Sequence, residues 1–342
     1  MKVKDKALST VKAALFRFLG RRLACFPSSP RLLDLQRCTS ADISRAVKRA
    51  QSNHPGAKIF VLSEGARADC PVKGVIAIDD WELLRPETGA CAVVLACNSD
   101  ELALNAINFI QSRKGMFYYG ADRNAPTARY FHRNEVARRV LKEASCVGFD
   151  KFDLMDFENI IQAIDATRPI PGDYVEIGVY KGASAYVALD YMERANLPRR
   201  SFFLDTFSGF DYPQAGVSAD RAWHNTHEEA SYEGAKKLLS RFRVPHDVLI
   251  SNIVTDPLPE AIKSISVCNI DVDMYEAVAA ALAKAAPRIS QGGIIIAEDQ
   301  GHTPLLLGAY AAVTEFLRSN EGRAFVPIQL SSGQMFMVKS RP

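Results

Sequence analysis

The chain has no long apolar run, no paired-cysteine spacing and little net charge. No uninterrupted hydrophobic stretch approaches the roughly 18 residues of a membrane-spanning helix, so we expect no such helix. With a formal net charge of +3 over 342 residues, the composition gives no reason to expect nucleic acid as a partner. The seven cysteines show no C-x-x-C spacing. This argues against a zinc or disulfide framework and predicts reduced, buried thiols in a cytoplasmic protein.

The N-terminus carries a basic segment interleaved with apolar residues. Arg17 interrupts the apolar stretch that a signal peptide would need. An amphipathic helix over residues 1–22 can rest on an anionic membrane surface. Such a helix more often packs on its own domain or on a partner subunit, so both uses remain open.

Residues 1–120 are predicted to form a small accessory domain. Short apolar runs alternate there with helical patterns, which is typical of an open α/β domain. The runs lie at 59–62, 75–78 and 92–96. No phosphate-loop pattern occurs, so a sugar-nucleotide pocket, a dimerisation module and a structural extension all remain open. We interpret residues 116–126 as a connection and place the domain boundary near residue 120.

The stretch from Gly172 to Ser184 organises the second domain, residues 121–342. Its first half is short, apolar and rich in β-forming residues, which suits a buried strand of a parallel sheet. Gly178 and Gly182 follow where the chain must turn into a helix, so that a ligand can approach the backbone and meet the N–H groups of the helix. Only a Gly-x-x-x-Gly spacing is present, and the missing third glycine argues against a dinucleotide.

Carboxylates lie at or just after the ends of four predicted strands of this domain. They are Glu176, Asp205, Asp271 with Asp273, and Glu298 with Asp299. A carboxylate at the end of the second strand is where an α/β nucleotide site holds ribose hydroxyls. We therefore expect these side chains to converge on one rim of the sheet. The last of the strands is predicted at 294–297, after a turn at Gly292 and Gly293.

Four sequence motifs occur in order along the second domain. They are Val-Glu-Ile-Gly-Val-Tyr-Lys-Gly (175–182), Phe-Leu-Asp-Thr-Phe-Ser-Gly-Phe (203–210), Asn-Ile-Asp-Val-Asp-Met-Tyr-Glu (269–276) and Gly-Gly-Ile-Ile-Ile-Ala-Glu-Asp-Gln-Gly (292–301). Together they resemble the class I S-adenosylmethionine-dependent methyltransferases, and more closely the macrocin-O-methyltransferase family of metal-dependent sugar O-methyltransferases. The resemblance covers about residue 121 to the C-terminus.

The resemblance implies an α/β fold of the class I methyltransferase type, with a smaller N-terminal α/β domain. The sheet would be Rossmann-like, seven-stranded and mostly parallel, and an antiparallel hairpin over 325–338 would close it. Members of the family are commonly oligomeric, so the resemblance also implies a homo-oligomer.

The resemblance implies S-adenosylmethionine as the cofactor. The residues placed around the cofactor are Glu176, Gly178, Gly182, Ser184, Asp205, Thr206, Phe207 and Asn252. The first three would lie by the methionine moiety, with Ser184 as an extra donor at the helix start. Asp205 would hold the ribose, Thr206 and Phe207 would touch the adenine, and Asn252 is a candidate at the end of the third strand.

A sugar hydroxyl is too weak an acid to attack a sulfonium methyl group unassisted. A hard cation such as Mg²⁺ can hold a vicinal diol and lower the pKa of the attacking hydroxyl. The family's metal ligands fall at Asp271, Glu298 and Asp299, and Glu298 stands where many members carry Asp. Two candidates for the general base remain open: His302, whose ordinary pKa lies near operating pH, and Asp273 as second choice.

The resulting prediction is an S-adenosylmethionine-dependent and Mg²⁺-dependent O-methyltransferase. Its acceptor would be a hydroxylated small molecule such as a sugar on a natural product or a surface-glycan precursor. Two other interpretations remain open. A nicotinamide-dependent oxidoreductase is disfavoured by the missing third glycine, and a non-catalytic methyltransferase-like scaffold is disfavoured by the complete set of carboxylates.

Overall fold

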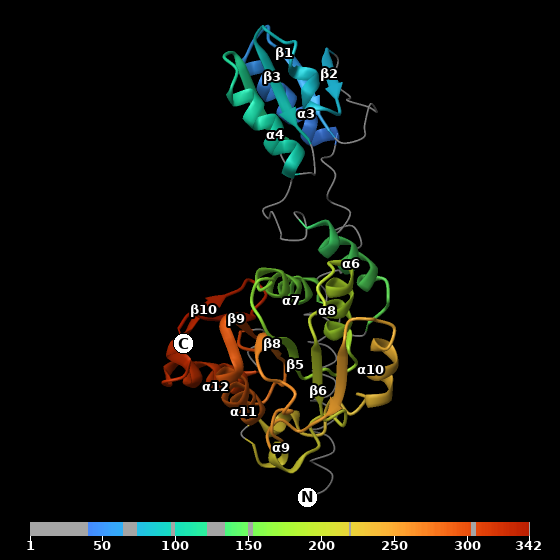
Figure 1. The fold of residues 1–342 in the computed structure, drawn as a ribbon, viewed down its shortest axis with the longest axis vertical. Coiled ribbons are helices and arrows are strands. Elements are labelled where there is room, and N and C mark those ends of the chain that lie inside the picture. The colour runs from blue at the N-terminus through green and yellow to red at the C-terminus, as the bar shows by residue number, and fades with distance from the viewer. Residues whose placement is uncertain are drawn as a thin grey trace, which may run out of the picture. The chain divides into compact units, whose positions relative to one another are not determined.

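The computed structural model describes most of the chain beyond residue 39. The described ranges are 40–63, 74–96, 100–121, 134–149, 153–218, 220–301 and 306–341. The basic segment over residues 1–22 and the candidate base His302 lie outside them. The described residues form two compact units, which divide after Arg138 (Figure 1). The assignment of residues 1–120 to an accessory domain stays a prediction.

The first unit is a four-stranded parallel sheet with helices on both faces. Its strands follow the order β2-β1-β3-β4, and their bounds are Lys58–Leu62 (β1), Val75–Ile78 (β2), Cys91–Leu95 (β3) and Met116–Gly120 (β4). Helix α3 (Ser40–Asn53) packs on one face and α4 (Asp100–Gln111) on the other. A short 3-10 turn covers Trp81–Leu84. The predicted open α/β domain is confirmed.

Strand β4 corrects one sequence expectation. The connection expected over 116–126 begins with a strand, which pairs in parallel with β3. The reason is that β4 lies at the edge of the sheet, where only Met116 of its five residues is buried. Its Met-Phe-Tyr-Tyr run is apolar and aromatic, but it continues into the polar residues that we interpreted as a connection.

The second unit contains a seven-stranded sheet in the order β10-β11-β9-β8-β5-β6-β7. The strand bounds are Asp173–Ile177 (β5), Ser201–Asp205 (β6), His246–Ile250 (β7), Ile265–Ile270 (β8), Ile289–Ala297 (β9), Phe325–Gln329 (β10) and Met335–Lys339 (β11). Neighbours from β7 to β9 pair in parallel, whereas β11 is antiparallel to both β9 and β10. The predicted sheet and its closing hairpin are confirmed.

Helices cover both faces of this sheet (Figure 1). The main helices are α6 (Glu135–Ser145), α7 (Leu154–Ala166), α8 (Ala183–Arg194), α10 (Tyr232–Leu239), α11 (Tyr275–Ala285) and α12 (Leu307–Arg318). Helices α11 and α12 share a core with Val175, Ile177 and Ile270 on one face. Alternate residues such as Tyr174 and Glu176 point to the other face, where α7 and α8 lie. Shorter turns cover 213–217 (α9), 221–223, 286–288 and 322–324.

Strand β9 is longer than the sequence predicted. The expected turn at Gly292 and Gly293 is instead a bulge inside the strand, which begins at Ile289. The pairing with β8 skips from Ile289 to Ile294, and the glycines occupy the interval. A Cβ atom on Gly293 would lie 2.9 Å from the Ser290 carbonyl oxygen, so the bulge requires glycine.

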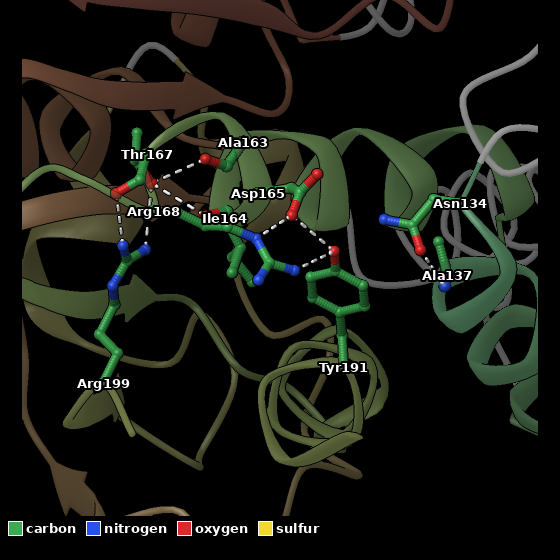
Figure 2. A network of polar contacts seen from close by, with 9 residues as sticks. All are labelled: Asn134, Ala137, Ala163, Ile164, Asp165, Thr167, Arg168, Tyr191 and Arg199. Carbon is green, nitrogen blue, oxygen red and sulfur yellow. Dashed lines mark hydrogen bonds and ion pairs between the residues drawn. The ribbon is translucent and has the colours of Figure 1, made fainter. Parts of the chain in front are cut away.

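A polar network fixes the C-terminal end of α7 (Figure 2). The Arg199 guanidinium donates to the Thr167 hydroxyl at 3.0 Å and to the Thr167 carbonyl at 2.6 Å. Asp165 accepts from the Tyr191 hydroxyl at 2.9 Å and pairs with Arg168. Since Tyr191 belongs to α8 and Arg199 precedes β6, the network ties α7 to both elements.

The structure bears on two expectations from composition. None of the helices that the structure describes is both long and apolar enough to cross a bilayer. Three cysteines fall in the described ranges and all are free thiols: Cys91 and Cys268 are buried, and Cys146 is exposed.

Candidate functional site

Gly178 brings the turn after β5 against the end of β8. Its backbone has φ +94, and a Cβ atom would lie 1.7 Å from the Asp271 carbonyl oxygen. The Asp271 N–H in turn donates to the Ile177 carbonyl at 2.9 Å. A residue with a side chain could not occupy this position without displacing the β8 end. The glycine turn and the carboxylates after β8 are therefore direct neighbours.

Gly182 begins helix α8 in the left-handed conformation, with φ +87. No side chain caps this helix. Its first-turn N–H groups are consequently available to an anionic ligand, which the helix dipole also favours. This is the arrangement expected from the glycine spacing.

Asp205 holds the same turn from the end of β6. One carboxylate oxygen accepts from the backbone N–H groups of Val179 at 2.6 Å and Tyr180 at 2.8 Å. The other accepts from the Phe207 N–H at 2.7 Å. A carboxylate has about four acceptor positions, so one stays available to a ligand hydroxyl. Asp205 thus shapes the turn as well as facing it.

Glu176 lies beneath the turn and is fully buried. Its two oxygens accept from the Tyr174 hydroxyl at 2.7 Å and from the Ser184 hydroxyl at 2.6 Å. Burial raises the pKa of Glu176 to about 7, although both hydrogen bonds favour the charged form. From the sequence we expected Glu176 to lie on the rim of the sheet with the other carboxylates. The structure instead encloses its side chain beneath the turn. It supports the turn from below, and Ser184 contacts it from the first turn of α8.

The remaining cofactor candidates lie in the loops after β6 and β7. The Thr206 hydroxyl donates to the Gly209 carbonyl at 3.0 Å, and the buried Phe207 ring packs edge-on against Tyr232. The Asn252 side chain accepts from the Val254 N–H at 3.0 Å. All three stabilise their own loops at the carboxyl ends of these strands. Their contact with adenine stays a prediction.

Three aspartates gather at the ends of β8 and β9. Oxygens of Asp271, Asp273 and Asp299 lie within 4.8 Å of one another. The Asp299 carboxylate accepts from the Asp273 backbone N–H at 3.0 Å. Within the described residues this is the arrangement of acidic side chains suited to holding a cation. Asp273, which the sequence suggested only as a second-choice base, is thus part of the cluster.

Glu298 lies apart from this cluster. Its side chain is inside the protein and accepts a hydrogen bond from the Gln334 amide. Burial, together with the carboxylates of Asp156, Asp271 and Asp299, raises the pKa of Glu298 well above its usual range. Asp271 and Asp299 thus belong to the three-residue cluster, whereas Glu298 is not one of its members and is bound by Gln334.

Sequence reasoning did not find two contacts that connect the site to its surroundings. Gln334, fully buried at the hairpin, contacts Glu298. The Tyr180 hydroxyl donates to Glu229 and joins the glycine turn to the polar loop over 208–231. For the contact of Gln334, the only signal in the sequence is a polar residue directly before the apolar strand β11. The contact of Tyr180 with Glu229 has no signal in the sequence.

The family model of "Macrocin-O-methyltransferase (TylF)" matches residues 114–324 of the chain. The chain belongs to the macrocin-O-methyltransferase family. The match includes the glycine turn and the carboxylates of the site, ends before Gln334, and excludes most of the first unit.

Two curated members of related activity align with part of the chain. An 8-demethyl-8-(2,3-dimethoxy-alpha-L-rhamnosyl)-tetracenomycin-C 4'-O-methyltransferase of Streptomyces olivaceus is 29% identical over 141 residues, 38% of this chain and 53% of that protein. A demethyldecarbamoylnovobiocin O-methyltransferase of Streptomyces niveus is 26% identical over 153 residues, 42% of this chain and 58% of that protein. The family member described here thus spans little more than half the length of these relatives.

Solved structures of O-methyltransferases match part of the chain. The O-methyltransferase NovP matches with a TM-score of 0.49 and 24% identity over 55% of this chain and 81% of its own. The calicheamicin methyltransferase CalS11 matches with a TM-score of 0.46 and 17% identity, over 63% and 93%. The strand order and the family match, and not these similarities, assign the class I methyltransferase fold to this family member.

Proposed function

We propose that the chain is an S-adenosylmethionine-dependent O-methyltransferase that acts on a sugar hydroxyl of a small molecule. One observation supports this most: the cofactor turn at Gly178 touches the backbone of Asp271, so a methyl donor and a cation-bound acceptor can share one rim. One relative's name contains a rhamnosyl group, which is consistent with a sugar acceptor on a natural product. A surface-glycan precursor belongs to the same chemical class.

The cofactor is held by the turn and the ends of β5, β6 and β7 in this proposal. The first turn of α8, which starts after Gly182, binds the methionine carboxylate through its N–H groups. Asp205 uses its remaining acceptor position for a ribose hydroxyl. Gly178 lets the ligand approach the backbone, and Thr206, Phe207 and Asn252 line the adenine side.

The donor set of Asp271, Asp273 and Asp299 fits a hard cation such as Mg²⁺, because all three ligands are carboxylate oxygens on adjacent strand ends. Such a cation would lower the pKa of the acceptor hydroxyl. With Asp273 inside this set, we assign the proton acceptor to His302, which follows Asp299 closely in the sequence. The three aspartates then orient the acceptor, and His302 removes its proton.

Methyl transfer tests the proposal directly. The full chain would be incubated with methyl-labelled S-adenosylmethionine and a panel of nucleotide sugars and glycosides, with Mg²⁺ and with chelator. We expect label in at least one glycoside and little transfer after chelation. Failure of every acceptor, with a melting temperature that S-adenosylmethionine does not raise, would contradict the proposal. A shift caused by NAD⁺ instead would favour the oxidoreductase interpretation.

The ribose role of Asp205 has its own test. Asp205→Asn replaces one oxygen that accepts two N–H groups and should weaken S-adenosylmethionine binding about 10-fold, a loss near 1.4 kcal/mol. Asp247→Asn is the matched control, since Asp247, on β7, forms an exposed ion pair with Arg200. Calorimetric affinities for both variants provide the measurement. An unchanged affinity in Asp205→Asn would remove this residue from the cofactor site.

A cytoplasmic location, a homo-oligomer and the absence of nucleic acid among the partners stay predictions. The same holds for membrane contact through residues 1–22. Loss of liposome co-sedimentation on deletion of that segment is the result that membrane contact requires.

A further inference from the structure

We propose that Glu298 and Gln334 form a clamp that positions Asp299, and that Glu298 is not itself a cation ligand. The inference rests on the proposed cation-dependent function. It differs from the ligand set that the family resemblance implies, which includes Glu298, and it follows from the contacts around the hairpin.

Gln334 connects three elements at one point. Its amide N–H donates to Glu298 at the end of β9. Its amide oxygen accepts from the Asn159 amide on α7 at 2.6 Å and from the Ser332 hydroxyl at 3.0 Å. Gln334 is fully buried. A buried amide engaged at both ends fixes the Glu298 side chain in the layer between the sheet and α7.

Glu298 and Asp299 face different surroundings. Ala297 pairs with Met335, so the next pair outward is Glu298 and Gln334. The Glu298 N–H continues the ladder by donating to the Ile270 carbonyl at 3.0 Å. Asp299 lies in the turn after β9, where the alternation of a strand no longer applies. Glu298 is held toward α7 by Gln334, which also binds Asn159, and the Asp299 carboxylate accepts from the Asp273 N–H.

The hairpin holds the chain on both sides of Asp299. Before it, Gln334 binds Glu298. After it, Gly301 lies against the hairpin loop, where a Cβ atom would be 3.0 Å from the Gly333 carbonyl oxygen. Asp299 itself is only 7% exposed. The chain on both sides of Asp299 is consequently held by hairpin residues that are not proposed cation ligands, while its carboxylate accepts from the Asp273 N–H. Residues outside the ligand set commonly orient metal ligands in this way.

A donor–acceptor exchange tests the clamp. Gln334→Glu removes the amide that donates to Glu298 and leaves two carboxyl groups facing each other at positions 298 and 334. In the double variant Glu298→Gln with Gln334→Glu, an amide at 298 donates to a carboxylate at 334, which can still accept from Asn159 and Ser332. The exchange thus keeps the hydrogen bonds named here while it removes the carboxyl group at position 298.

The measurement is Mn²⁺ affinity of the full chain by calorimetry, without acceptor, alongside its S-adenosylmethionine affinity. We expect Gln334→Glu to weaken Mn²⁺ binding about 10-fold. The Mn²⁺ affinities of Glu298→Gln and of the double variant should stay within about 3-fold of the wild-type value. Loss of a residue that orients a metal ligand typically costs about 10-fold or more. Asp299→Asn, which removes a proposed ligand, is the control for a true loss. S-adenosylmethionine affinity should change little in all clamp variants, a split that a general loss of folding would not produce.

Two outcomes would overturn the inference in distinguishable ways. If Glu298→Gln loses Mn²⁺ as Asp299→Asn does, and the exchange does not restore binding, Glu298 is a ligand and the clamp assignment fails alone. If the wild-type chain binds S-adenosylmethionine but no Mn²⁺, the proposed cation site fails and the inference falls with it. Melting temperatures of all variants verify folding, and should Gln334→Glu not fold, Glu298→Gln and the double variant still decide.

Discussion

Gly178 carries two requirements in one residue. Its φ of +94 disfavours any L side chain, and the Asp271 carbonyl oxygen occupies the space of a Cβ. The first requirement alone costs about 1 kcal/mol, and the second forces a backbone shift. From the sequence we explained this glycine by the approach of a cofactor. The contact with the end of β8 involves a segment almost 100 residues away, so the sequence around Gly178 gives no sign of it.

We expect Gly178→Ala to destabilise the chain by about 3 kcal/mol or more, because strain and clash add. Gly148→Ala is the matched control, since Gly148 has φ +81 but nothing within 4 Å of its Cβ position. Denaturant unfolding of both variants gives the difference. Equal losses of stability would mean that the Asp271 contact carries no weight.

The buried carboxyl of Glu176 makes stability depend on pH. Its pKa is about 7 in the folded chain, against an ordinary value of 4.5. Between these values the unfolded chain has released the proton that the folded chain keeps. The stabilising contribution is therefore fully present below about pH 4.5 and is lost as pH rises through about 7, a change of about 3 kcal/mol.

Glu176→Gln should remove this pH dependence, because an amide does not titrate and can still bond to Tyr174 and Ser184. The free energy of unfolding, measured at several pH values from 5 to 8, should fall less in the variant than in the wild type. Parallel pH profiles for the two chains would contradict the assignment.

At the scale of elements, α7 is held by named contacts at its C-terminal end and at its middle. The Thr167 carbonyl accepts from Arg199 (Figure 2), and Asn159, in the middle of the helix, donates to Gln334. The helix thereby connects the start of β6 to the hairpin. A change in either contact should alter how α7 covers the buried face of the sheet.

Arg199→Met keeps the apolar stem but removes both hydrogen bonds to Thr167. We expect a loss of about 1 to 3 kcal/mol, because the helix carbonyl loses a charged donor. Arg200→Met is the neighbouring control: Arg200 pairs with Asp247 in solvent, and such pairs contribute about 1 kcal/mol or less. Thermal unfolding distinguishes them, and a larger effect at Arg200 would contradict the network's role.

The sequence predicted most elements but not how two of them pair. The buried strands β5, β6 and β8 showed themselves as apolar runs, since both faces are covered. The pairing of β4 with β3 and the bulge in β9 had no such signal, because pairing and register depend on the neighbouring strands. The same limit applies to the site. The sequence indicated which strand ends carry carboxylates, but the direction of Glu298 depends on Gln334 across the sheet.

At the scale of the whole molecule, the two units have separate hydrophobic cores. The cores of the first unit lie on either side of β1 and β3, and a large core of the second joins α11 and α12 to the sheet. The family match begins at residue 114, just before β4, and so leaves out most of the first unit. Binding of S-adenosylmethionine should therefore stabilise one unit and leave the other unchanged.

Scanning calorimetry of the full chain should show two unfolding transitions, of which S-adenosylmethionine raises only one. A single transition that moves as a whole would mean that the units unfold together.

The strand order has a practical consequence for redesign. The proposed donor-binding side chains come from β5, β6 and β7, and the three aspartates come from β8 and β9, on the opposite flank of β5. The segments that follow Asp273 and Asp299 can thus be exchanged for those of a relative, while the donor half, the three aspartates and the Asp271 backbone that contacts Gly178 keep their sequence. In this proposal, acceptor preference is determined by the half of the sheet that contains β8 and β9, and it can be changed by exchanging one segment at a time.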